Sequence, residues 1–140
     1  MLRAAVLALL MFQAAQTPPP AAGDAKKALD QIQGNWLIVS FNGQDVPAGN
    51  ELYLVFTGEK YEQWVNGSVE ERGTVKLDPS TKPMSIDLSI VEGNDAGKLQ
   101  LGLIEVTGDT MNLSFAAPGV PTRPKTPDDA ELYAVLKKKK

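Results

Sequence analysis

Short turn signals separate alternating apolar segments in this chain, and they constrain its fold more than any other feature. Asn42-Gly43, Gly58-Glu59, Asn66-Gly67 and Gly108-Asp109 suit tight hairpin connections that need positive φ. Between the turns, apolar and polar residues alternate with the period of two typical of a half-buried strand, most clearly over 84–90. Links this short force strands that are neighbours in sequence to pair in space, so the pattern predicts an antiparallel meander.

The predicted meander has eight strands, and its edges would expose unpaired backbone groups unless the last strand pairs with the first. An immunoglobulin-like sandwich is the competing arrangement, but it needs crossovers between sheets that tight links do not supply. We therefore expect an all-β fold, an eight-stranded antiparallel up-and-down barrel preceded by a short helix over Asp24–Gln33. The expected strands are Trp36–Phe41, Leu52–Phe56, Tyr61–Val65, Val69–Leu77, Met84–Ile90, Leu99–Val106, Met111–Ala116 and Glu131–Lys137.

Residues 1–22 have the pattern of a cleaved export signal followed by a proline-rich linker. Arg3 gives a positive start, residues 4–12 are apolar, and small residues and prolines follow. The apolar run is shorter than the roughly 20 residues that a membrane-spanning helix needs, so no span is expected in the mature chain. These features predict a secreted or periplasmic protein with its barrel domain over residues 23–140 and a cleavage site between Ala14 and Ala22.

The chain has no cysteine and no histidine, which excludes zinc sites built on those ligands, cysteine nucleophiles and histidine general bases. It carries 14 basic and 17 acidic residues, and the basic set includes the terminal run 137–140. The rest of the surface is therefore acidic, which argues against a nucleic-acid partner. No G-x-S-x-G elbow, phosphate-binding glycine loop or calcium loop is present, so no catalytic residue, metal or cofactor is expected.

The segment Gly34-Asn35-Trp36 stands at the head of the first predicted strand and resembles the G-x-W signature of lipocalin-like barrels. In that family the tryptophan packs across the closed end of the barrel, and a basic side chain near the end of the last strand covers its ring. Lys137 is closest to that place here, so the resemblance implies a closed end built from Gly34, Trp36 and Lys137. A cation over an indole face stabilises by about 0.5–2 kcal/mol, although the family usually offers arginine, whose planar head stacks better than an ammonium group.

A broader resemblance covers nearly all of the predicted domain. The chain is similar to a lipocalin-like domain family of unknown function that is abundant in planctomycetes and acidobacteria. That family has no assigned activity, so the resemblance implies the fold and no site residue. The matching landmarks are Ile32–Trp36, Leu54–Tyr61, Gly73–Pro79, Lys82-Pro83 leading into Ile86–Leu88, Gly108–Thr110, Phe115–Gly119 and Arg123-Pro124.

The turn at Gly58-Glu59 predicts which side chains share the barrel interior. A two-residue link there pairs Phe56 with Tyr61 and Leu54 with Gln63, and the turn at Gly108-Asp109 aligns Val106 and Ile104 with Met111 and Leu113 in the same way. The strands over 36–41 and 99–106 are apolar on both faces, which leaves their inward sets open and suggests that the N-terminal helix covers part of the outside. A barrel of this size either fills with side chains or encloses one small ligand, and the sequence is compatible with both.

Polar residues near the predicted interior are the candidate ligand contacts. Tyr61, Gln63 and Glu71 would orient the polar end of a ligand among apolar residues that include Leu54 and Phe56. The alternative for Gln63 and Glu71 is a position near a mouth, where they are either solvated or paired with Arg72 or Lys60. Arg123, set among prolines in the long connection 117–129, either clamps a carboxylate ligand or pins its own loop to the barrel.

Our leading hypothesis from the sequence is an exported lipocalin-like binding module for a small, largely apolar ligand, acting without catalysis. The alternative is a packed barrel that serves as an extracytoplasmic protein-interaction, scaffold or inhibitor module through its acidic body and the proline-rich connection 117–129. An enzyme that uses Tyr61 or Glu71 is a third option. The size of the interior cavity separates the first two hypotheses.

Overall fold

The computed structural model describes residues 22–139, so the expected export signal lies outside the described residues except for Ala22, where the helix begins. The helix starts slightly earlier than expected, and Asp24 lies in its first turn. The elements are α2 (Ala22–Gln31), β1 (Gly34–Phe41), β2 (Gln44–Asp45), β3 (Leu52–Thr57), β4 (Lys60–Val65), β5 (Ser68–Asp78), β6 (Met84–Glu92), β7 (Leu99–Thr107), β8 (Thr110–Phe115), the 3-10 helix η1 (Pro127–Asp129) and β9 (Leu132–Lys138).

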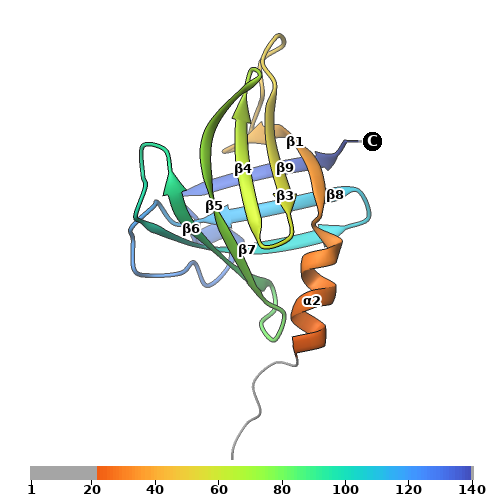
Figure 1. Cartoon of the computed structure of the whole chain (residues 1–140), viewed down its shortest axis with the longest axis vertical. Coiled ribbons are helices and arrows are strands. Elements are labelled where there is room, and N and C mark those ends of the chain that lie inside the picture. Colours follow the sequence, from red (N-terminus) through yellow and green to blue (C-terminus); the bar gives the residue numbers. More distant parts are fainter. Residues whose placement is uncertain (1–21, 140) are drawn as a thin grey trace, which may run out of the picture.

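The strands form one antiparallel sheet that closes on itself (Figure 1). The order is β2-β1-β3-β4-β5-β6-β7-β8-β9, and an additional pairing of β1 with β9 closes the circle. The predicted all-β, up-and-down barrel of the lipocalin-like type is thus confirmed. Two short elements were not predicted: η1 in the long connection, and β2, a two-residue strand that pairs with the end of β1 through Ser40 and Phe41 and lies outside the circle of eight.

The tight turns set the pairing registers as predicted. Leu54 lies opposite Gln63 and Phe56 opposite Tyr61 across β3 and β4. Across β7 and β8, Ile104 lies opposite Leu113 and Val106 opposite Met111. Partners in an antiparallel register point to the same face, so these pairs all contribute to the barrel interior.

One end of the barrel is plugged by packed side chains and covered by α2. Trp36 is fully buried there, and its indole Nε1–H donates a 2.8 Å hydrogen bond to the carbonyl oxygen of Ile32, directly after the helix. The side-chain amide of Gln33 holds the same turn to the β3–β4 hairpin, since it donates to the carbonyl of Gly58 and accepts from the Gly58 amide. The largest buried side chains around Trp36 include Ile32, Phe56, Ile86, Ile104, Met111 and Leu136.

The structure also assigns the inward faces that the sequence left open. Trp36 and Ile38 of β1 point inward, as do Gln100 and Ile104 of β7. The helix covers the end of the barrel, with its closest strand contacts on β5, whereas the connection 117–129 lies against the outside of β6 and β7. The helix that was expected to cover part of the outside thus lies at the end of the barrel, and the connection 117–129 covers the outer face of β7 instead.

Lys138, and not Lys137, covers the tryptophan. The Lys138 Nζ lies 5.4 Å from the centroid of the Trp36 ring, while Lys137 donates a 2.8 Å hydrogen bond to the hydroxyl of Thr110. The pairing register explains the difference, because Trp36 lies opposite Lys138 and Leu37 opposite Lys137. Opposite residues share a face, so Lys138 points to the indole side and Lys137 points outward.

Replacing Trp36 by alanine should lower the free energy of unfolding by about 3–5 kcal/mol, as for other large buried aromatics. The substitution removes a fully buried ring and its hydrogen bond to Ile32 at the end where α2 docks. Urea unfolding followed by circular dichroism measures the loss. Trp64→Ala is the matched control, because Trp64 is only half-buried and stands outside the core cluster. Equal losses for the two variants would contradict the plug.

Candidate ligand-binding site

The end of the barrel opposite α2 is hollow. A cavity of about 270 Å³ lies inside the barrel there. At this end, Phe41 of β1 lies opposite Ala134 of β9, far along both strands from Trp36 and Lys138. The interior is therefore plugged in one half and open in the other, which combines the two possibilities that the sequence left. The side chains that line the cavity are Ile38, Phe41, Leu54, Gln63, Glu71, Leu88, Asp95, Gln100, Leu113, Phe115, Pro118, Leu132 and Ala134.

A row of side chains crosses β3, β4 and β5 at the boundary between plug and cavity. Leu54 lies opposite Gln63, and Gln63 lies opposite Glu71. A register shift follows directly after Gln63 in the β4–β5 ladder. The row places an amide and a carboxyl side by side on an otherwise apolar wall, and a few polar groups among apolar residues are typical of small-molecule sites.

Gly73 makes room for the group that holds Glu71. A Cβ on Gly73 would lie 2.7 Å from Cε1 of Tyr61 and 2.1 Å from the carbonyl oxygen of Ser89, both closer than atoms can pack. The tyrosine ring, which lies opposite Gly73 in the ladder, occupies this space and is buried to 1% exposure. Its hydroxyl donates a 2.9 Å hydrogen bond to Oε2 of Glu71. A side chain at position 73 would displace the tyrosine and release the carboxyl.

Burial controls the ionisation of this pair. Desolvation raises the pKa of the Glu71 carboxyl above its usual range, and the negative charge of Asp95 raises it further, while the Tyr61 hydrogen bond acts in the opposite direction. Burial and the adjacent Glu71 also raise the pKa of the Tyr61 phenol far above its ordinary value. The phenol therefore keeps its proton and acts as a fixed donor to Glu71.

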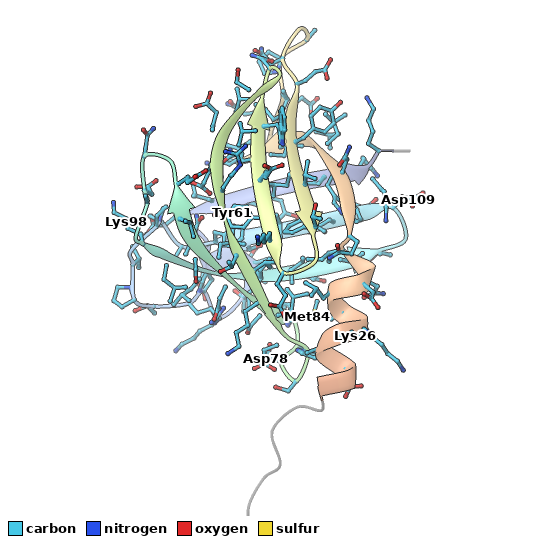
Figure 2. All side chains as sticks on the ribbon, viewed as in Figure 1. Lys26, Tyr61, Asp78, Met84, Lys98 and Asp109 are labelled. Carbon is cyan, nitrogen blue, oxygen red and sulfur yellow. The ribbon has the colours of Figure 1, made fainter. Side chains whose placement is uncertain are left out.

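The opposite wall is apolar apart from one amide. Gln100 of β7 is buried, and its Nε2 donates a 3.1 Å hydrogen bond to the carbonyl oxygen of Ala116. On the same strand, Gly102 leaves space for the ring of Phe115, because a Cβ at position 102 would lie 2.3 Å from Cδ1 of that ring. Figure 2 shows Lys98 on the connection between β6 and β7. Its Nζ donates a 3.0 Å hydrogen bond to Oδ1 of Asp95, which lines the cavity at its rim.

The structure brings half of the predicted ligand contacts into the cavity. Leu54, Gln63 and Glu71 line it. Phe56 and Tyr61 lie deeper in the core, at 2% and 1% exposure, where Tyr61 supports Glu71. The suggested pairing of Glu71 with Arg72 is wrong, because Arg72 forms ion pairs with Glu62 and Glu92 instead.

Arg123 lies on the outside of the barrel and pins its loop. Its guanidinium Nη1 donates to the carbonyl oxygens of Ile86 (3.1 Å) and Gly102 (2.9 Å), and Nη2 forms an ion pair with Asp87. These contacts hold the connection 117–129 against β6 and β7. Arg123 does not line the cavity, so its role as a ligand clamp is replaced by the loop-pinning alternative.

Asp95 and Gln100 also line the cavity, although neither was predicted to do so. Asp95 stands in Gly93-Asn94-Asp95, which has the composition of a turn and serves as one. Gln100 carried a usable signal, because it is a lone amide in the strongly apolar segment 99–106. A polar residue inside such a strand is expected to find a hydrogen-bond partner, and Gln100 finds it in Ala116.

The fold and the cavity together define a lipocalin-like β-barrel with one plugged end and one open mouth. No protein-family model, curated protein or solved structure matches the chain. Among residues 22–139, no group of acidic side chains is arranged to hold a metal ion. Within the same range, no helix combines the length and the apolar character needed to cross a bilayer.

Glu71→Gln should stabilise the protein above the pKa of Glu71. Folding raises this pKa from its ordinary value of 4.5, so the folded state holds the proton more tightly than the unfolded chain does. The resulting stability is present below pH 4.5 and is lost as the pH rises through the raised pKa. We expect the midpoint of urea unfolding of the variant to exceed that of the wild type near pH 8 and to converge with it in acid. Glu70→Gln, at the exposed neighbouring position, controls for the lost charge, and a constant difference between Glu71→Gln and wild type at all pH values would contradict the shift.

Arg123→Ala should lower the free energy of unfolding by about 2 kcal/mol, because hydrogen bonds of a charged group to Ile86, Gly102 and Asp87 are lost. Lys125→Ala, an exposed cation of the same connection, is the control and should change stability by less than about 0.5 kcal/mol. Chemical denaturation of both variants measures the difference. Equal effects would show that Arg123 does not anchor the loop.

Proposed function

We propose that this chain is an exported binding module that holds a small, largely apolar molecule in the mouth of its barrel without catalysing a reaction. The cavity of about 270 Å³ is the observation that carries the proposal. Most of its lining is apolar, and the polar residues among it are few, as is usual for sites that bind small molecules. Such a hollow favours ligand binding over a packed barrel that acts only through its surface.

The size of the cavity limits the ligand. Sites for drug-sized molecules measure roughly 300–1,000 Å³, and this cavity falls just below that range. It exceeds the roughly 150 Å³ of an apolar protein cavity that accepts benzene. A ligand with one ring or a short alkyl chain and a single polar group therefore fits the available space.

Two observations support a binding role over catalysis. The Tyr61 phenol, with its pKa raised by burial and by Glu71, stays protonated and directs its hydrogen to Glu71. The second carboxyl group of the cavity, Asp95, is paired with Lys98 at the rim, so it is engaged by a cation instead of acting as a partner acid or base for Glu71. The export part of the proposal is supported by the residue pattern of 1–22 and places the protein in the periplasm or outside the cell.

Filling the cavity should weaken binding. Ala134 lines it, and Ala134→Phe places a ring in the space that the ligand needs. We expect phenethyl alcohol, a neutral probe, to cause saturable shifts in the amide NMR spectrum of the wild type and to bind the variant at least about tenfold more weakly, which is about 1.4 kcal/mol. Val135→Phe, whose side chain comes from the other face of β9, should bind like the wild type.

Two results would refute the proposal. One is the absence of saturable binding of phenethyl alcohol to the folded wild type. The other is equal binding by Ala134→Phe and wild type with circular dichroism spectra showing that both are folded.

A further inference from the structure

The polar lining of the cavity has one sign of charge. Its polar members are Gln63, Glu71, Asp95 and Gln100, and the residues that line the cavity include no lysine or arginine. Of the two acidic residues, Asp95 forms an ion pair with Lys98 at the rim. None of the ion pairs among residues 22–139 involves Glu71. A ligand in this cavity therefore meets a carboxyl group that has no cationic partner from the described part of the chain.

Two donors beside this wall are engaged within the protein, and two carboxyl oxygens are left without a hydrogen bond from the described residues. The Tyr61 hydroxyl donates its proton to Oε2 of Glu71, and Gln100 Nε2 donates one proton to the carbonyl oxygen of Ala116. Oε1 of Glu71 and Oδ2 of Asp95 accept no hydrogen bond from residues 22–139. A ligand that supplies donors complements these oxygens, while the side-chain amides of Gln63 and Gln100 keep protons that can be donated to an acceptor.

We infer that the ligand of this cavity is a small organic cation, an ammonium group on a short apolar body whose nitrogen donates to Glu71. This inference rests on the proposed binding function and names its ligand class. The apolar body packs against residues such as Ile38, Leu88 and Leu113, and the charged head stays at the polar row on β4 and β5. The site is the cavity itself, and the carboxyl group on its wall selects the sign of the ligand.

Charge discriminates this class from the other small amphiphiles. An ammonium group beside Glu71 forms a charge-assisted hydrogen bond, which is about twice as strong as one between neutral groups. A fatty acid or another carboxylate would bring a second negative charge next to Glu71 and Asp95, which disfavours ionisation of all of them. An alcohol of the same shape can bind but forms only the weaker, neutral interaction.

Three probes with one skeleton test the inference on the full chain: phenethylamine, phenethyl alcohol and phenylacetate, titrated at pH 8 by isothermal calorimetry. We expect the amine to bind about tenfold more tightly than the alcohol, and the carboxylate to bind most weakly. Glu71→Gln should remove the preference for the amine, so that the amine and the alcohol bind the variant with affinities within about twofold of each other. Glu70→Gln carries the same loss of charge at an exposed position and should keep the preference.

The pH dependence gives a second readout. The titratable groups that face Glu71 are Tyr61 from β4 and Asp95 from the β6–β7 connection, where Lys98 binds Asp95. Burial raises the pKa of Glu71, so lowering the pH neutralises it and should weaken amine binding while alcohol binding stays constant. The amine affinity of Glu71→Gln should change less with pH than that of the wild type.

The possible outcomes separate this inference from the proposed function. Binding of the alcohol as tightly as the amine, or an amine preference that persists in Glu71→Gln, overturns the cationic ligand and leaves a neutral-ligand site. Failure of all three probes to bind overturns the binding function and the ligand class together. Tighter binding of phenylacetate than of the amine overturns the assignment of sign.

Discussion

A barrel of eight strands has two ends, and the burial of Trp36 decides what each end of this one can do. The indole joins Ile32 of the turn after α2 to the first strand, and Lys138 of the last strand covers its ring. Helix docking, closure of the sheet and filling of one half of the interior thus meet at a single side chain. The half that the indole does not reach is the half that can hold a ligand.

Pairing across short turns was predictable from the sequence, and pairing across the long connection was not. Leu54 with Gln63 and Phe56 with Tyr61 follow from the positive-φ turn at Gly58, because a two-residue link allows one register. The register of β9 depends instead on the 117–129 connection, which adds no such constraint. A shift of one residue there changes which face a side chain occupies, and this explains why Lys137 was expected where Lys138 lies.

The candidate site was predictable only for residues on strands that are joined by tight hairpins, namely β3, β4 and β5. Gln63 and Glu71 were identified because strand alternation places them near the interior, and both line the cavity. Asp95 and Arg123 depend on how longer connections fold back on the barrel, and local pattern carries no information about that. Arg123 in particular binds Asp87, which is 36 residues away in the chain. The sequence left two roles open for Arg123, binding a carboxylate ligand or fixing its own loop, and its contacts with β6 and β7 show the second.

The closing pair of strands also determines how the molecule is presented to its surroundings. The first strand begins and the last strand ends at the plugged end, where Trp36 lies opposite Lys138, and α2 extends from that same end (Figure 1). The mouth lies at the other pole. Any tether, fusion partner or solid support attached through either end of the described chain would therefore hold the barrel by its base and leave the mouth facing outward, so immobilisation would not obstruct entry to the cavity.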